Sequence, residues 1–243
     1  MTQNSAPPLL PGVSIVLPCH DEEENVAEAI DTALFAARRS ALEHEVIVVD
    51  DGSTDLTRQI ALAFKQQDPS VRVVVHESNL GYGAALRSGI AAASEPWILL
   101  TDADQQFDLT QLEDFLPFAP DHDLIVGRRM PRMDPLGRRM AAAAWNRLVD
   151  VVFALPVRDV DCAFKLVRAD LVKDMPLVSS GAMISTELVV RCLEQGARLE
   201  ELGVRHRPRH AGHQSGTSPR VVARAFRELV SARRELGSLR HAH

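Results

Sequence analysis

The sequence is poor in the features that mark secreted and membrane-spanning chains. It has only three cysteines, Cys19, Cys162 and Cys192, an odd number with no C-x-x-C pair, which excludes complete internal pairing. No stretch reaches the ~18 apolar residues that a membrane span requires. Residues 1–11 contain neither the charged nor the apolar region of a signal peptide. We therefore expect a protein of the reducing cytoplasm.

Excess positive charge is also lacking. The 243 residues carry a formal net charge of -6, which argues against a nucleic-acid partner. Hydrophobic residues make up 46% of the chain, enough for a sizeable core. No long linker, internal repeat or low-complexity tract divides the sequence. We expect one large domain over residues 1–218 and a locally basic C-terminal helix and tail over residues 219–243.

Apolar runs alternate with helical patterns along the chain, which predicts an α/β fold with a mainly parallel central sheet and helices on both faces. The strands expected from short, continuous apolar runs are at 13–18, 45–50, 71–76, 97–101 and 123–127, with a turn and short strand within 159–167 and an edge strand at 198–206. The expected helices are at 26–39, 56–67, 84–93, 109–118, 141–153, 185–194 and 219–236.

Two aspartates follow the predicted strand at 97–101. Asp102 and Asp104 leave the sheet together, at the edge where an open α/β sheet binds its ligands. Two hard carboxylates suit Mg²⁺ or Mn²⁺ bridging to a phosphate, and Gln106 adds a neutral oxygen. An isolated Asp-x-Asp is often only a solvated turn, so the interpretation depends on the surrounding motifs.

Polar residues also follow the first two predicted strands. Residues 18–25 read Pro-Cys-His-Asp-Glu-Glu-Glu-Asn, and residues 50–55 read Asp-Asp-Gly-Ser-Thr-Asp. A carboxylate at this edge can accept hydrogen bonds from a base N–H or from ribose hydroxyls. Asp51 is the better candidate for ligand contact, whereas Ser53 or Asp55 is expected to cap the next helix.

Taken together, these motifs resemble those of the family-2 inverting glycosyltransferases, which have the GT-A nucleotide-diphospho-sugar fold. The matching segments are 13–18 with 22–25, 48–55, 79–83 and 102–104. Within that family the chain looks most like the dolichol-phosphate (polyprenyl-phosphate) mannosyltransferase branch. The segments that carry this closer likeness are 104–106, 126–129, 146–147 and 161–165.

The resemblance implies which residues meet the nucleotide. Pro18, His20 and Glu22 would line the nucleotide pocket, and His20 stands where relatives usually have tyrosine. Val49 and Asp51 would contact the base and the ribose.

The resemblance likewise implies which residues bind the diphosphate and a metal ion, Mg²⁺ or Mn²⁺. Asp102, Ala103 and Asp104 would hold them, with Gln106 as a further metal ligand.

Two arginines complete the set that the resemblance implies. Arg129 matches the arginine of the family's Gly-Ser-Arg-Tyr motif, and Arg209 matches the arginine of its late Arg-x-x-Gly segment. A lysine often found shortly after that glycine is absent here. Gln214 and Ser215 stand in its place, which leaves the acceptor open.

The chemistry of sugar transfer is consistent with these residue roles. A sugar that leaves its nucleotide diphosphate builds negative charge on the departing phosphate, which a divalent ion and arginines stabilise. Attack from the opposite face inverts the anomeric carbon. An ionised phosphate acceptor needs no base, whereas a hydroxyl acceptor does. Asp161, Glu187 and His210 are the candidate bases, and Glu187 is alternatively a solvated helix position.

Basic segments suggest where the protein works. Residues 128–139 are arginine-rich, and residues 206–216 combine two arginines with three histidines; both segments can bind anions. The helix at 219–236 has apolar residues on one side and arginines around the rest, so it can lie on an anionic membrane or pack on the domain or a partner subunit. We expect a cytoplasmic protein, with peripheral binding to the inner face of the cell membrane and homo-oligomerisation as open options.

The leading hypothesis is an enzyme that transfers a hexose from GDP-mannose or a UDP-sugar to a polyprenyl phosphate, metal-dependently and with inversion. The alternative keeps this donor and uses a hydroxyl of a small molecule or secondary metabolite as acceptor. A non-catalytic sugar-nucleotide binding module is disfavoured by the intact Asp-x-Asp. A nucleotidyltransferase is disfavoured because the chain's opening lacks a glycine- and lysine-rich phosphate loop.

Overall fold

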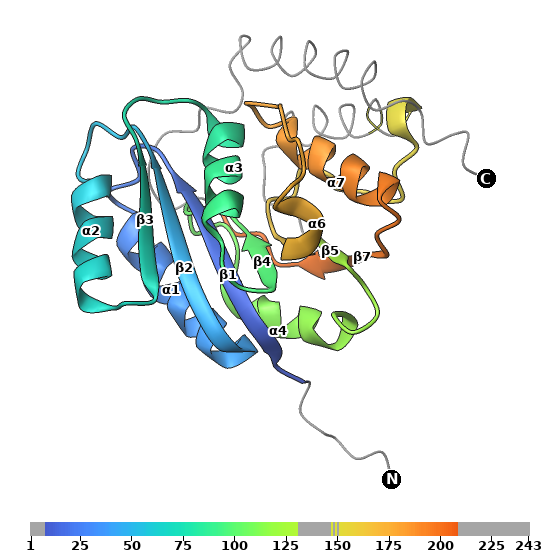
Figure 1. Ribbon diagram of the computed structural model, residues 1–243, viewed down its shortest axis with the longest axis horizontal. Coiled ribbons are helices and arrows are strands. Elements are labelled where there is room, and N and C mark those ends of the chain that lie inside the picture. Colours follow the sequence, from blue (N-terminus) through green and yellow to red (C-terminus); the bar gives the residue numbers. More distant parts are fainter. Residues whose placement is uncertain (1–7, 131–146, 148, 150, 209–243) are drawn as a thin grey trace.

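A seven-stranded sheet with the order β3-β2-β1-β4-β6-β5-β7 runs through the computed structural model (Figure 1). The structure describes residues 8–130, 147, 149 and 151–208. The strands are β1 (Leu10–Cys19), β2 (Ala41–Asp51), β3 (Val71–His76), β4 (Trp97–Leu100), β5 (Leu124–Arg129), β6 (Lys165–Arg168) and β7 (Leu199–Val204).

Strand directions decide which residues meet at the edge of the sheet. The β1–β2, β1–β4, β2–β3 and β5–β7 pairs are parallel, whereas β6 is antiparallel to both β4 and β5. The prediction of a mainly parallel sheet is confirmed. Strands β1 to β5 and β7 therefore end at one edge, and β6 begins there. Residues just before β6 consequently lie near residues that follow β4 and β5.

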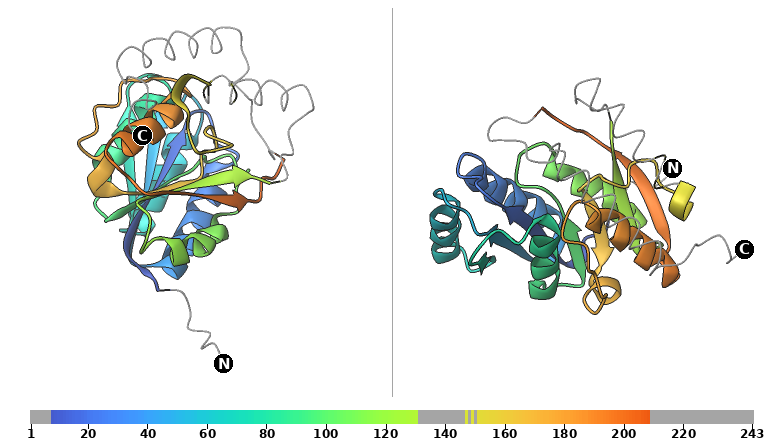
Figure 2. Two further views of the ribbon diagram at one scale, coloured as in Figure 1. Left: turned by 90° about the vertical axis from the view of Figure 1, so that its right-hand side faces the viewer. Right: turned by 90° about the horizontal axis from the view of Figure 1, so that it is seen from above.

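Helices cover both faces of the sheet, as predicted (Figure 2). One apolar core includes residues of α1 (Val26–Ser40), α2 (Thr57–Gln67) and α4 (Leu112–Phe115). The other includes residues of α3 (Tyr82–Ala92), α6 (Ala169–Val172) and α7 (Ile184–Glu194). Successive residues of β2 alternate between the two cores, because side chains of a strand point to opposite faces.

Some elements differ from the sequence-based expectation. The single helix expected at 109–118 is wrong: the segment consists of two 3₁₀ turns, Leu109–Gln111 and Leu116–Phe118, on either side of α4. Pro117 lies at the start of the second turn, where its missing N–H interrupts regular helical bonding. The first strand is longer than expected because pairing with β2 begins at Leu10.

Several predicted features fall outside the described residues. They are Arg209, His210, the domain boundary at 218, the C-terminal helix and tail, and most of the loop 128–139 and of the helix 141–153. Within the part of the chain that the structure describes, the helices are too short or too polar to traverse a bilayer.

A buried carboxylate ties together the end of the sheet opposite the acidic turn. Glu45 Oε1 accepts hydrogen bonds from Ser14 Oγ at 2.7 Å, from Ser94 N at 2.5 Å and from Ser94 Oγ at 2.7 Å. Its Oε2 accepts from Arg72 at 2.7 Å. Burial raises the pKa of Glu45, but the hydrogen bonds from Arg72, Ser14 and Ser94 outweigh burial and leave the pKa below its ordinary value.

We expect Glu45→Gln to lower the free energy of unfolding by about 1–3 kcal/mol near neutral pH, because buried donors lose a charged acceptor. Because the pKa of Glu45 is lower in the folded state, its ionised carboxylate stabilises the fold at pH values above its unfolded-state pKa of about 4.3. This stabilisation is lost as the pH falls through the folded-state pKa. Denaturant unfolding at several pH values should therefore show a smaller loss of stability below pH ~5 in Glu45→Gln than in the wild type. Glu43 is exposed, so Glu43→Gln serves as the control. It should change neither the free energy of unfolding near neutral pH nor the loss of stability at low pH. Equal acid sensitivity of Glu45→Gln and wild type would contradict this account.

Candidate active site

The acidic turn directly follows β4. Asp102 is partly buried, Ala103 is buried and Asp104 is only 8% exposed. Gln105 has a φ of 61°, in the left-handed region, and Gln106 N donates to Asp104 Oδ1 at 3.1 Å. The predicted pair of carboxylates is thus held in a tight turn at the carboxyl edge of the sheet.

Asp102 lies among groups from three other elements. Tyr82, the first residue of α3, donates its hydroxyl to Asp102 Oδ1 at 3.0 Å. Burial raises the pKa of Asp102, while the Tyr82 hydrogen bond and the positive charges of Arg129 and Lys165 oppose that rise. Burial, followed by the charge of Asp102, raises the pKa of Tyr82 well above its usual value, so the hydroxyl stays a donor.

The donor set suits a hard divalent cation. Asp102 and Asp104 supply carboxylate oxygens, and Gln106 Nε2 donates to Arg207 O at 3.1 Å, which leaves the amide oxygen as the potential ligand. Among the described residues, no group of three or more His, Cys, Asp or Glu side chains is gathered to hold a metal. A cation at this turn would therefore take its other ligands from a diphosphate and water.

Arg129, at the end of β5, reaches the same edge. Its Nε and Nη2 donate to the two oxygens of Asp159, at 2.7 and 2.6 Å. The Arg129 side chain is 15% exposed and that of Asp159 is 4% exposed. This fork raises the pKa of Arg129 despite its burial. The structure thus places Arg129 near Asp102 and adds Asp159 as the residue that orients it.

Lys165 is a charged residue whose role the sequence did not reveal. It begins β6, is 1% exposed and donates Nζ to the carbonyl oxygen of Cys162. Burial lowers the pKa of Lys165, and its interactions with Cys162, Asp161 and Asp159 oppose this. Asp161 is partly buried beside these groups. The motif 161–165 included Lys165 only as part of a family likeness, and its position at this edge follows from the antiparallel direction of β6.

The end of β7 is fastened to the acidic turn. Arg207 N donates to Gln106 O at 2.8 Å, and the Arg207 guanidinium pairs with Asp108 at 2.8 Å. Phe107 forms an isolated bridge with His206, and their rings are in edge contact. The first residues of the basic segment 206–216 are thus held beside the proposed cation site.

The loops that follow β1 and β2 are interlocked. Asp21, whose φ is 52°, accepts a hydrogen bond from Thr54 N at 2.7 Å, and Asp21 N donates to Ser53 Oγ at 3.1 Å. Asp55 Oδ1 accepts from Thr57 N at 2.9 Å, so Asp55 stabilises the start of α2, the role expected of Ser53 or Asp55. The two loops therefore form one rim of the candidate site.

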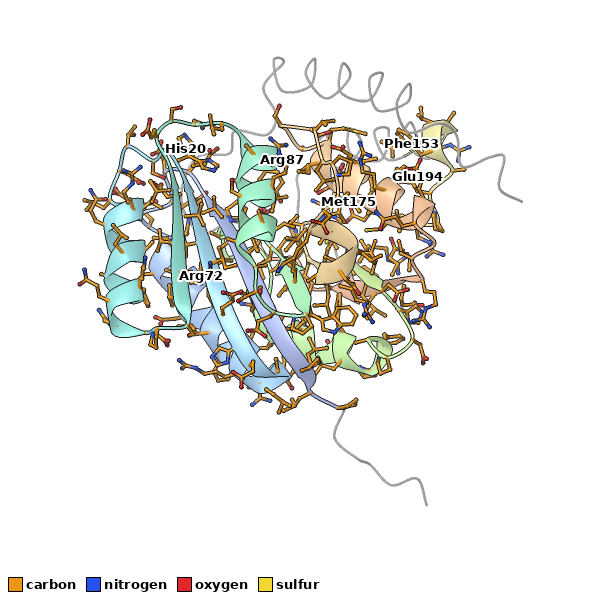
Figure 3. The ribbon with its side chains drawn as sticks, viewed as in Figure 1. His20, Arg72, Arg87, Phe153, Met175 and Glu194 are labelled. Carbon is orange, nitrogen blue, oxygen red and sulfur yellow. The ribbon has the colours of Figure 1, made fainter. Side chains whose placement is uncertain are left out.

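The residues expected to line the nucleotide pocket lie around this rim. The side chain of His20 is 39% exposed, and Figure 3 shows it near the loops at the top of the sheet. Pro18 and Glu22 are partly buried, and Glu22 N donates to Thr57 Oγ1 at 2.8 Å. Val49 is 0% exposed, main chain included, and its side chain packs in a core, so this structure does not expose Val49 to a ligand.

Asp51 is more constrained than the sequence suggested. It is 3% exposed, and its carboxylate accepts hydrogen bonds from Leu80 N at 2.9 Å and from Gly81 N at 2.8 Å. Asp51 Oδ1 also lies 2.7 Å from Nδ1 of His76. Its carboxylate thus fixes the loop before α3, in addition to any contact with a ligand.

The position of Gly52, next to Asp51, requires a glycine both for its backbone conformation and for the absence of a side chain. Its φ is +70°, and an added Cβ would lie 2.4 Å from the carbonyl carbon of Ser78. We expect Gly52→Ala to cost about 1–2 kcal/mol of stability for the left-handed conformation, plus the displacement of the loop before α3. Gly196→Ala is the matched control, because its φ is +81° and nothing lies within 4 Å of the added Cβ. Thermal unfolding should show the larger loss in Gly52→Ala; equal losses would contradict the proposed clash.

The candidate bases are now distinguishable. Glu187 is 1% exposed, so its alternative interpretation as a solvated helix position is wrong. Its carboxylate accepts hydrogen bonds from Val178 N at 3.0 Å and Ser179 N at 2.8 Å, and it pairs with Arg191 at 3.0 Å. Glu187 therefore stabilises the segment before α7 through these contacts. Asp161 lies beside Arg129 and Lys165 at the site, and His210 lies outside the described residues.

An acidic turn after β4, at the edge of a mixed sheet covered on both faces, is the arrangement of the GT-A glycosyltransferases, and this chain is a glycosyltransferase enzyme of that fold. It belongs to glycosyl transferase family 2, whose family model matches residues 14–175. The recognition made from the sequence motifs is confirmed.

Individual relatives support the same assignment. An uncharacterized glycosyltransferase of Mycobacterium tuberculosis (strain ATCC 25618 / H37Rv) is 31% identical over 204 residues, which cover 82% of this chain and 87% of the relative. The dodecaprenyl-phosphate galacturonate synthase of Rhizobium johnstonii is 28% identical over 222 residues, covering 90% of this chain and 64% of that protein. Glucosyl-3-phosphoglycerate synthase from Mycobacterium tuberculosis, crystallised with Mn2+, UDP and glucosyl-3-phosphoglycerate, has a similar fold, with a TM-score of 0.70 at 20% identity over 91% of this chain and 79% of that one.

Proposed function

We propose that this enzyme transfers a hexose from a nucleotide-diphospho-sugar to a polyprenyl phosphate, with a divalent cation and with inversion of the anomeric carbon. The observation that carries the proposal is that Asp102, in the turn that also holds Asp104, lies near the cationic Arg129 and Lys165 at one edge of the sheet. Carboxylates that can bind a metal ion thus lie next to basic side chains that can bind a phosphate. The similarity to a dodecaprenyl-phosphate sugar synthase supports a lipid phosphate as acceptor.

The donor would lie across the interlocked loops. Its nucleoside would meet Pro18, His20 and Glu22, with Asp51 at the base or ribose. Its diphosphate would lie at Asp102, Ala103 and Asp104. Mg²⁺ or Mn²⁺, held by Asp102 and Asp104 with Gln106 as a further ligand, would neutralise charge on the leaving phosphate.

The acceptor would approach from the side of Arg129, and Arg209, the second arginine that the resemblance implies, would also bind it. The Asp159 carboxylate already holds the Arg129 guanidinium in one plane. A phosphate would therefore meet a hydrogen-bond donor that is already oriented, so little side-chain entropy is lost on binding. An ionised phosphate oxygen attacks without giving up a proton, so no general base is needed. With a hydroxyl acceptor, we propose Asp161 as the base, because it is partly buried near Arg129 and Lys165.

Labelled GDP-mannose, UDP-glucose and UDP-GlcNAc, each incubated with polyprenyl phosphate and Mn²⁺, test the proposal. We expect one donor to yield a labelled lipid extractable into organic solvent. Donor hydrolysis without a sugar-lipid from any donor would reject the acceptor. Transfer to an added small-molecule hydroxyl, lost in Asp161→Asn while donor binding survives, would favour the alternative.

We also propose that the basic segment 219–243 brings the enzyme to an anionic membrane, where polyprenyl phosphates reside. Clustered arginines near a membrane surface each contribute about 1 kcal/mol of attraction to anionic lipid. The full chain should sediment with phosphatidylglycerol vesicles at low salt and not with phosphatidylcholine vesicles. Equal recovery with both would contradict this part of the proposal.

A further inference from the structure

Tyr82 is the one tyrosine of the chain, and it lies at the centre of the candidate site. Its hydroxyl donates to Asp102 Oδ1 at 3.0 Å. Its ring is packed against the core that includes residues of α3 and α7. A tyrosine side chain has only two rotatable bonds, so a packed ring holds its hydroxyl at a defined point.

The segment that carries Tyr82 is fixed from the β2 and β3 side. Asp51 accepts hydrogen bonds from Leu80 N and Gly81 N, at 2.9 and 2.8 Å. Asp51 is in turn 2.7 Å from His76 Nδ1, and His76 Nε2 is 2.8 Å from Ser88 Oγ on α3. This network closes on α3 itself, so the helix start cannot shift without breaking bonds at buried groups.

The same segment is also fixed from the side of α7. Gly83 N donates to Ser180 O at 3.0 Å, and an added Cβ on Gly83 would lie 2.3 Å from Ser179 O. Arg87, labelled on α3 in Figure 3, donates to the same Ser179 carbonyl. The start of α3 is therefore clamped on both sides, and Tyr82 projects its hydroxyl to Asp102 from a rigid base.

We propose that Tyr82 is a positioning residue that holds Asp102 so that it binds the cation through Oδ2 alone, and that it thereby favours Mg²⁺ and Mn²⁺ over Ca²⁺. This inference rests on the proposed function, in which Asp102 is a metal ligand. The hydroxyl proton lies against Oδ1, so a cation bound to both oxygens would be brought close to that proton. Mg²⁺ requires a near-ideal octahedron of single oxygens, whereas Ca²⁺ accepts more ligands and bidentate carboxylates.

Calorimetric titration of Mn²⁺ and Ca²⁺ tests the proposal, with UDP or GDP present at saturation. We expect Tyr82→Phe to weaken Mn²⁺ binding by about 10-fold, because one hydrogen bond to a charged group is lost. Ca²⁺ binding should change by less than about threefold, because a freed Oδ1 allows a bidentate contact. The ratio of the two affinities therefore falls.

Ser70→Ala is the matched control. Ser70 Oγ donates to Asp68 Oδ1 at 2.6 Å, so this change also removes a hydroxyl–carboxylate bond, but in the turn before β3, at the opposite edge of the sheet. It should leave the affinities for both cations unchanged.

A second measurement uses the single tyrosine. Incorporation of 3-fluorotyrosine gives one ¹⁹F resonance, which should shift when Mg²⁺ and the nucleotide are added and should not shift in Asp104→Asn. Unchanged Mn²⁺ affinity in Tyr82→Phe, or an equal loss for both cations, would overturn the positioning role. A wild-type protein that binds neither cation with either nucleotide would instead overturn the proposed function.

Discussion

Replacing Asp104 with asparagine is expected to reduce sugar transfer by about 10³-fold while the protein stays folded. Asp104 is 8% exposed and lies in the turn that would hold the cation. An amide keeps the shape of the side chain and can still accept a hydrogen bond from Gln106 N, but it removes the negative charge. The departing phosphate would then develop its charge without a firmly bound cation.

The measurement compares turnover, Mn²⁺ affinity and the melting temperature in the same preparation. Asp121→Asn makes the same chemical change at an exposed position and should leave all three as in the wild type. If Asp104→Asn bound Mn²⁺ and turned over the donor like the wild type, the acidic turn would not be the cation site. A melting temperature lowered together with turnover would point to a structural role instead.

Asp159→Asn is expected to destabilise the fold by about 3 kcal/mol or more, because removing one partner of a buried ion pair leaves the other charge uncompensated. Asp159 is 4% exposed, and both of its oxygens accept from Arg129, at 2.6 and 2.7 Å. Asp159 also accepts from the main-chain N–H of Arg129 at 3.2 Å. An amide offers a single acceptor oxygen, so the bidentate fork is lost.

Asp123→Asn provides a comparison at the surface. Asp123 pairs with Arg198 at 3.2 Å, but the Arg198 side chain is 58% exposed. Solvent screens such a pair, and its loss should cost no more than about 1 kcal/mol. Urea unfolding of both variants gives the two values. If the two changes cost the same, the Arg129–Asp159 pair would not be an internal support of the site.

Local sequence patterns were enough to predict most of the fold and the position of the acidic turn after β4. Continuous apolar runs are the signal of strands buried on both faces, and β3, from Val71 to His76, has the expected limits. The paired acids were identified because their spacing and their position just after a strand are both local properties. The helix expected at 109–118 failed because Pro117 interrupts regular α-helical bonding within an apolar pattern that otherwise reads as helical.

By itself, the sequence therefore determined the order of strands and helices, the acidic turn and the family. Tertiary structure alone decided that β6 runs antiparallel, which brings Asp159 and Lys165 to the edge where Asp102 lies. It also decided that Tyr82, twenty positions before Asp102, donates to that carboxylate. These contacts join residues far apart in the chain. Their formation depends on strand direction and on packing between helices, which no short stretch of sequence encodes.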